Sequence, residues 1–178
     1  MRAARATGLI LSVFMVFVVC SPVSGGDWSE FAISQGQQDQ ERPDIDGTIA
    51  VWQQLAGANY DIYAADINEP CAPQVYKIQD LDDTLERPRV YGDTVIWQRF
   101  VESDWDIWAA DITNLDEPNR YPISDFIDVD EQFPAISGNI VLWESDYYGD
   151  WDIFGADITD PCYPALFLAG AYYDSNQR

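Results

Sequence analysis

Histidine is absent from this chain, and lysine occurs once, at Lys77. The lack of histidine excludes Ser-His-Asp and Cys-His catalytic arrangements and any histidine-ligated zinc site. Basic residues are scarce altogether, because nine Lys and Arg stand against 31 Asp and Glu, for a formal net charge of −22. Such a surface repels nucleic acid and anionic lipid headgroups, so we expect neither as a partner. A basic protein or a cation suits this charge better.

Long apolar runs are also lacking, with one exception near the start. Gly8 to Val19 is apolar, follows Arg2 and Arg5, and precedes a short stretch of small and polar residues. A dozen apolar residues are few for a membrane span, and the arrangement is typical of a secretory signal. We expect residues 1–25 to be a signal peptide, and residues 26–178 to be exported to a periplasmic or extracellular location without a membrane span.

One sequence pattern occurs three times, shifted by 45 and then by 46 residues. Each copy has a proline, a glycine turn, an apolar run ending in tryptophan and an Asp-Ile-aromatic segment ending in a second aspartate. The repeated residues are Trp52, Trp97 and Trp143, then Asp61, Asp106 and Asp152, and finally Asp66, Asp111 and Asp157. A period of this size, built from short apolar runs and turn residues, is typical of β-propeller blades.

The repeat predicts an all-β fold of three four-stranded propeller blades, at about residues 35–79, 80–124 and 125–169. In the second repeat the strands are expected at residues 87–90, 94–99, 105–112 and 120–123. A glycine joins the first two strands of each repeat, since such turns need positive φ. The second strand is apolar at successive positions, which favours a sheet packed on both faces.

The repeated tryptophans and aspartates are interpreted as structural. A residue that every blade needs fills the space between blades more readily than it serves one binding site. An aspartate at a strand end accepts backbone N–H groups from the adjoining turn. This interpretation covers the three tryptophans and all six repeated aspartates.

These elements resemble the TolB-like or WD40-like propeller repeats of bacterial envelope proteins. The resemblance spans about residues 31–169 and rests on the proline-led first strand, the glycine turn, the apolar second strand and the Asp-Ile-Tyr-like third strand. The Ser-Pro-Asp-Gly common in that family is reduced here to the glycine and a neighbouring Asp or Asn. The resemblance implies an exported interaction scaffold more firmly than it implies any activity.

Three blades are fewer than the four to eight that close most propellers. Phe31 to Ser34 match the fourth strand at residues 121–124, so we expect an additional outer strand before the first blade. The uncovered blade faces are explained by a longer propeller, by two copies that pair as a homodimer of three plus three blades, or by an open three-bladed monomer.

Cysteine is rare after the expected signal segment. Cys71 and Cys162 occupy the same position in repeats one and three, a whole blade apart. Disulfide geometry needs Cα atoms within about 7 Å, so we expect free thiols or intermolecular links.

Acidic and aromatic residues that break the repeat concentrate in the loops expected at one end of the blades. This rim is the expected binding surface of a non-enzymatic scaffold, with a protein or a glycan as partner. Its members are Asp82, Asp83, Glu102, Asp104, Trp105, Asp128, Asp130, Asp146, Tyr147 and Tyr148.

Two alternatives use the same carboxylates. Asp125, Asp128 and Asp130 are candidate ligands for Ca²⁺, which prefers several carboxylate oxygens, although their spacing is not that of an EF-hand. Glu102 and Asp146 are a candidate pair for glycoside hydrolysis, which needs two carboxyl groups about 5–10 Å apart. No cofactor other than Ca²⁺ is expected.

Overall fold

The computed structural model describes residues 31–34, 36–69, 72–79 and 83–170. Within these ranges the chain forms twelve β-strands, and no helix is long and apolar enough to cross a membrane. The expected signal segment 1–25, Cys71 and Asp82 lie outside the described residues.

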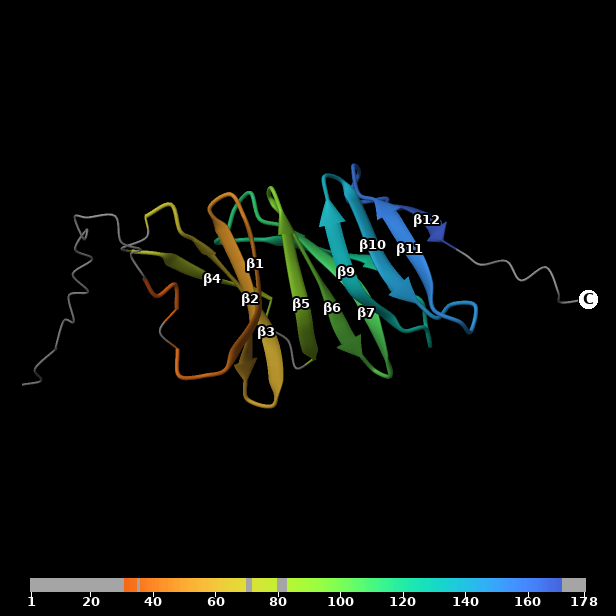
Figure 1. Ribbon diagram of the computed structural model, residues 1–178, viewed down its shortest axis with the longest axis horizontal. Helices are drawn as coiled ribbons and strands as arrows, with labels where there is room; N and C mark the ends of the chain where they lie inside the picture. Colours follow the sequence, from red (N-terminus) through yellow and green to blue (C-terminus); the bar gives the residue numbers. More distant parts are fainter. Residues whose placement is uncertain (1–30, 35, 70–71, 80–82, 171–178) are drawn as a thin grey trace, which may run out of the picture.

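The strands form three four-stranded antiparallel sheets that follow one another along the chain and along the long axis of the molecule (Figure 1). The first sheet contains β1 (Gln40–Asp46), β2 (Ile49–Ala56), β3 (Asn59–Asp66) and β4 (Gln74–Gln79). The second contains β5 (Thr84–Tyr91), β6 (Thr94–Val101), β7 (Asp104–Asp111) and β8 (Asn119–Ser124). The third contains β9 (Glu131–Ser137), β10 (Ile140–Ser145), β11 (Asp152–Asp157) and β12 (Ala165–Gly170). The expected all-β fold with three four-stranded sheets is confirmed.

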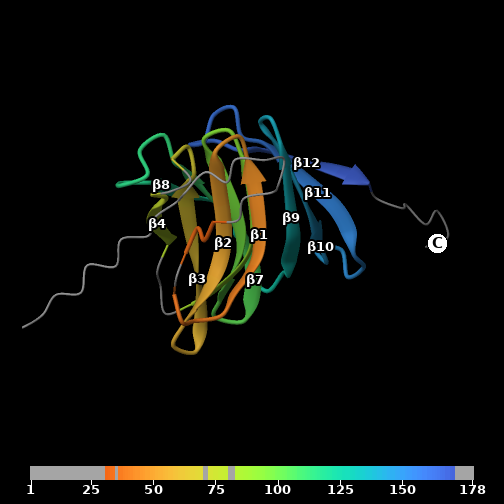
Figure 2. The same cartoon turned by 60° about the vertical axis from the view of Figure 1, so that its left-hand side comes forward.

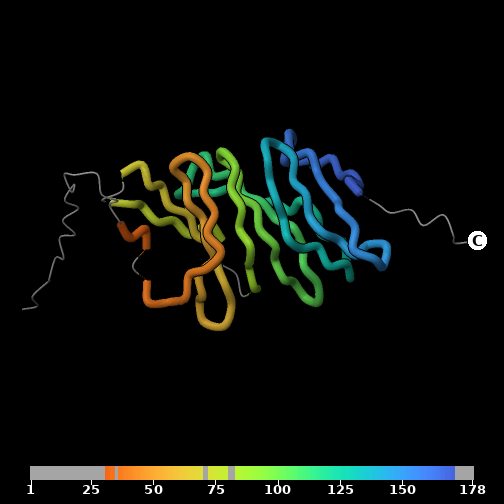
Figure 3. The backbone as a smooth tube through the Cα atoms, in the orientation of Figure 1, coloured from red at the N-terminus to blue at the C-terminus, as the bar shows by residue number. Residues whose placement is uncertain are grey.

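Each sheet is an up-and-down meander, as the chain trace in Figure 3 shows. The turn between its first two strands contains Gly47, Gly92 or Gly138, with φ of 56°, 54° and 59°. Positive φ is open to glycine at no steric cost, which explains why glycine recurs at this turn.

The sheets stack face to face (Figure 2). The first strand of the second sheet, and likewise that of the third, packs across the first three strands of the sheet before it. We call the face turned toward the following sheet the back face and the opposite one the front face. The first apolar cluster joins the back of the first sheet to the front of the second, and includes Val51, Ile62, Leu85 and Trp97. The second cluster joins the second and third sheets, and includes Ile96, Ile107, Val141 and Trp143.

The middle sheet is therefore buried on both faces. Val95 and Trp97 belong to the first cluster, whereas Ile96 between them belongs to the second. Side chains alternate between the faces of a strand, so a strand with apolar residues at successive positions fits between two neighbours.

A repeated hydrogen bond ties each sheet to the next. The first strand of every sheet bulges at a residue of positive φ, namely Arg42 (φ 53°), Arg87 (φ 57°) and Phe133 (φ 58°). The bulge turns a backbone N–H toward the preceding sheet, where a glutamine side chain accepts it. Gln53 Oε1 accepts from Arg87 N at 2.9 Å, and Gln98 Oε1 accepts from Phe133 N at 3.0 Å.

A second repeated feature caps the third strand of each sheet. Asp66, Asp111 and Asp157 each accept, at 2.9 Å, the backbone N–H of the residue two positions on. This is an Asx turn, in which the carboxylate replaces a backbone acceptor. The structural role predicted for Asp66, Asp111 and Asp157 is confirmed.

The additional outer strand expected at Phe31 to Ser34 is not formed, since these described residues belong to no strand. Ile33 and Ser34 nevertheless lie over the front face of the first sheet, at a cavity of about 230 Å³ lined also by Ala50 and Trp52.

We expect Gln98→Ala to destabilise the stack. The change removes the buried acceptor of the Phe133 N–H and leaves that donor unsatisfied at a sheet junction, which costs about 1–3 kcal/mol. Urea unfolding measures the loss. Gln38→Ala, at an exposed position, is the control. Equal midpoints for the two variants would contradict the role given to Gln98.

Candidate binding surface

The turns β2–β3, β6–β7 and β10–β11 and the segment that links the second sheet to the third lie at the same ends of the strands, along one edge of the stack. The segment 124–131, which links the second sheet to the third, runs between the β6–β7 turn and the β10–β11 turn. Three hydrogen bonds define this path. Asp104 Oδ2 accepts from Val129 N at 3.2 Å, Asp130 Oδ1 from Trp105 N at 3.2 Å, and Asp146 Oδ1 from Asp130 N at 2.9 Å.

The structure thus brings together Asp104, Asp130 and Asp146 from three separate segments. Their carboxylates accept backbone N–H groups, and each such bond fixes one loop on another. These three predicted rim residues hold the loops in place, and one oxygen of each carboxylate already accepts a backbone N–H.

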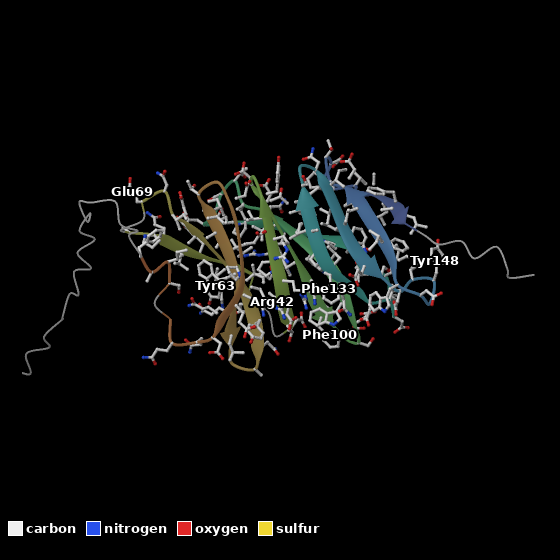
Figure 4. The ribbon with its side chains drawn as sticks, viewed as in Figure 1. Arg42, Tyr63, Glu69, Phe100, Phe133 and Tyr148 are labelled. Carbon is white, nitrogen blue, oxygen red and sulfur yellow. The ribbon has the colours of Figure 1, made fainter. Side chains whose placement is uncertain are left out.

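An aromatic cluster lies beside them. Tyr147 contacts Phe126 (ring centroids 5.1 Å apart), Tyr148 (5.0 Å) and Phe154 (6.0 Å). Phe154 is buried in the second apolar core, so the cluster is anchored from below. Tyr148, labelled in Figure 4, is 66% exposed, and the neighbouring Ile127 is 88% exposed. A large exposed apolar surface on a rigid base is a feature of interaction sites.

The other predicted rim residues are spread more widely. Asp83 accepts Nε and Nη2 of Arg99, at 3.1 and 2.7 Å, on the second sheet. Trp105 packs on Phe100 with centroids 5.2 Å apart. Glu102 and Asp128 are exposed and have positive φ, of 54° and 58°. Asp82 lies outside the described residues.

This geometry supports neither the Ca²⁺ site nor the pair of hydrolytic carboxylates that the sequence suggested as alternatives. Among the described residues, no three Asp, Glu or Cys side chains form a group that could hold a metal ion, so Asp125, Asp128 and Asp130 are not assembled as Ca²⁺ ligands. Glu102 and Asp146 lie in different turns, on either side of the segment 124–131, and Asp146 already accepts a backbone N–H.

A buried carboxyl beneath this surface escaped sequence reasoning. Glu131 is 0% exposed between the second and third sheets. Its Oε1 accepts from Ser124 Oγ at 2.6 Å and from Trp143 Nε1 at 3.0 Å, while Oε2 has no hydrogen-bond partner among the described residues. Burial raises the pKa of Glu131 to about 7. The hydrogen bonds from Ser124 and Trp143 favour the charged carboxylate and offset part of this rise.

Asp106 is a second perturbed acid, on the face of β7 that it shares with Trp108 and Ala110 and that is turned toward the first sheet. Burial first, and then the charges of Asp104 and Asp125, raise its pKa to about 7. Its counterpart Asp61 is paired with Lys77 at 2.9 Å, but the second sheet has Pro122 where the first has Lys77. The two repeated aspartates thus have different surroundings, and neither accepts a backbone N–H within the described structure.

The repeat itself contained the signal for Glu131. This residue pairs with Ser145 in the register that pairs Leu85 with Arg99, so a glutamate replaces a fully buried leucine. The exposed Ile127 and the anchoring Phe126 and Phe154 were also missed, since no spacing rule marks them.

The cysteine prediction is tested at one position. Cys162 is a free, exposed thiol in the β11–β12 loop, at the opposite end of the strands from the aromatic cluster. Cys71 is outside the described residues.

Comparisons with known proteins add no relative to this geometry. No protein-family model matches the chain, and no curated protein matches it.

We expect stability to depend on pH through Glu131 and Asp106. Between the unfolded value near 4.5 and the folded value of about 7 for Glu131, the folded state binds the extra proton. The free energy of unfolding therefore falls as pH rises through this window and stays lower above it. Urea titrations from pH 4 to pH 8 measure the slope.

Glu131→Gln keeps an acceptor for Trp143 without the buried charge. It should make the slope shallower, leaving the contribution of Asp106, and stabilise the protein at pH 8 by about 1–2 kcal/mol. Glu117→Gln, at an exposed position, is the matched control. A wild-type stability that is constant between pH 4.5 and pH 7 would show that neither acid is shifted.

Proposed function

We propose that this protein is a non-enzymatic, exported β-propeller-type scaffold that binds a cationic protein segment through the aromatic cluster of Phe126, Tyr147 and Tyr148. The exposed aromatic surface, anchored on the core through Phe154, is the observation that carries the proposal.

The propeller assignment is supported by the repeated junction. Propeller blades are four-stranded meanders, each packed on the next around an axis. The three sheets have this topology, and the two junctions between them are built alike. At each, the first strand of one sheet packs on the preceding sheet, bulges at a residue of positive φ and donates a backbone N–H to a glutamine. The resemblance to TolB-like repeats favours the same fold and, with the expected signal segment, an exported scaffold.

The partner class follows from charge and from ring chemistry. The chain has a formal net charge of −22, and the loops around the cluster add exposed Asp125, Asp128 and Asp150. Exposed aromatic rings attract Lys and Arg side chains by cation–π contacts, worth about 0.5–1 kcal/mol each at exposed sites. A neutral glycan would stack on the rings but would gain nothing from the charge.

The hydrogen bonds of the rim acids support a structural role for them rather than a catalytic one. The carboxylates of Asp104, Asp130 and Asp146 hold the loops together by accepting backbone N–H groups. A general acid or base must instead be within reach of substrate.

We expect a fluorescent peptide of alternating Arg and Gly to bind the protein with an affinity that falls as salt is added, since surface charges are screened. Tyr147→Ala and Tyr148→Ala should each weaken binding about tenfold, which is about 1.4 kcal/mol and a moderate effect for an interface residue. Fluorescence anisotropy measures both effects. Tyr163→Ala, at a tyrosine in the β11–β12 loop that is more exposed than either of these, is the control and should bind as wild type.

An array of neutral oligosaccharides forms the second arm of this experiment. Binding to the array without binding to the peptide would contradict the cationic partner. Equal effects of the three tyrosine variants would contradict the assigned surface.

A further inference from the structure

A cavity of about 230 Å³ lies against the front face of the first sheet. Apolar cavities of about 150 Å³ are large enough to hold a benzene ring, so this one has room for a small organic molecule. We call it the Trp52 cavity. Its lining is mainly apolar and includes Ile33, Gln40, Glu41, Pro43, Ala50 and Trp52.

The other two sheets show what fills the corresponding place. Strand register places Gln40 of β1 where β5 has Leu85 and β9 has Glu131. Leu85 is fully buried in the core cluster of Trp97 and offers that indole N–H no acceptor. Glu131 is also fully buried, and its carboxyl accepts from Trp143 Nε1 at 3.0 Å. The position therefore accommodates an isobutyl group in one sheet and a hydrogen-bond acceptor in another.

In the first sheet the side chain at this position leaves the place open. Gln40 lines the cavity but is exposed. Its Nε2 donates to Ser34 Oγ at 2.8 Å and to Gln54 Oε1 at 3.0 Å. The space that a leucine or a glutamate side chain occupies in the other sheets is thus unfilled beside Trp52.

The indole of Trp52 supplies an unused hydrogen-bond donor at this cavity. Trp52 is 6% exposed, and its Nε1 has no hydrogen-bond partner within the described residues. Its ring stacks on Tyr63, which Figure 4 labels, with centroids 6.0 Å apart. In the third sheet the equivalent N–H of Trp143 donates to the residue at the register position of Gln40. By this equivalence, the open place is where an acceptor for the Trp52 N–H belongs, and a buried donor gains from being paired.

The charges around the cavity narrow the ligand class. Glu41 is part of the lining, and the chain has a formal net charge of −22, so an anionic ligand would be repelled. An ammonium group would be attracted, but it only donates hydrogen bonds and cannot accept from Trp52. A neutral amide has both functions, because its carbonyl accepts and its N–H donates. The carbonyl suits the Trp52 N–H, and the amide N–H suits the carboxylate of Glu41.

We propose that the Trp52 cavity binds a small neutral molecule that carries a branched aliphatic group and an amide. The aliphatic group takes the place that Leu85 has in the second sheet. The amide carbonyl takes the place of the Glu131 carboxyl and accepts from Trp52 Nε1. This site is on the first sheet and is independent of the aromatic cluster proposed to bind a cationic segment.

Three probes with one carbon skeleton test the ligand class at pH 7, namely isocaproamide, isocaproate and isohexylammonium. Each is titrated into the nitrogen-labelled full chain, and nitrogen–proton correlation NMR follows the Trp52 indole resonance, assigned by its loss in Trp52→Phe. Isocaproamide should shift this resonance downfield and saturate, with a Kd on the order of 1 mM for a ligand of this size. Isocaproate should bind at least about tenfold more weakly because of its charge. The indole resonances of Trp97 and Trp143, which are buried between sheets, are internal controls and should not move.

Gln40→Leu tests the location of the site. The variant gives β1 the leucine that β5 has at this position, so it should fill the cavity, abolish the shift caused by isocaproamide and raise the urea midpoint. Gln38→Leu makes the same change at an exposed position before β1 and should bind as wild type.

Three results would overturn the proposal. The first is a Trp52 resonance that isocaproamide does not shift in a saturable way, as expected of a cavity that holds only water. The second is a Gln40→Leu variant that is folded, by its urea midpoint, and still binds isocaproamide as wild type does. The third is tighter binding of isohexylammonium than of isocaproamide, which would assign the cavity to cations.

Discussion

Burial of apolar side chains between successive sheets is the interaction on which the described structure depends. Neither core cluster lies within one sheet, because each takes its members from two. Trp97 and Trp143 are the largest fully buried side chains, and both lie at such a junction. A four-stranded sheet alone would expose both of its faces, so each sheet is stable only through its neighbours, as in other repeat proteins. The backbone bonds from Arg87 to Gln53 and from Phe133 to Gln98 fix the register of this packing.

Packing between successive sheets also supports the loop surface. The segment 124–131 is both the link between two sheets and the support of the aromatic cluster, and the Asp104, Asp130 and Asp146 carboxylates tie it to both neighbouring turns. Phe154 is a member of the second core and a contact of Tyr147. The proposed binding surface is therefore an extension of the packing between the second and third sheets, and its shape depends on how well these sheets are joined.

The threefold repeat predicted the four-stranded sheets and the glycine turns, because both follow from a local pattern of apolar and turn residues. It could not reveal the bulges at Arg42, Arg87 and Phe133, since the positive φ there accompanies an irregularity of strand pairing that no local residue pattern marks. The sequence placed these acidic residues in loops but not the hydrogen bonds between the loops, which join residues 16 and 25 positions apart. At Glu131 the sequence departs visibly from the repeat, but the burial of this side chain could not be read from the sequence.

Glu131 makes the two described junctions different in kind. The first has Leu85 at this position and leaves the Trp97 Nε1 without a partner among the described residues, so the packing tolerates an unsatisfied indole N–H. A hydrogen-bond acceptor for the Trp143 Nε1–H therefore does not by itself account for the buried carboxyl of Glu131. What the substitution adds is a dependence on protons, since both acids have pKa values near 7. The third sheet, which carries Tyr147 and Tyr148, packs on the second through Glu131, so we expect this junction to weaken as the pH rises toward 7.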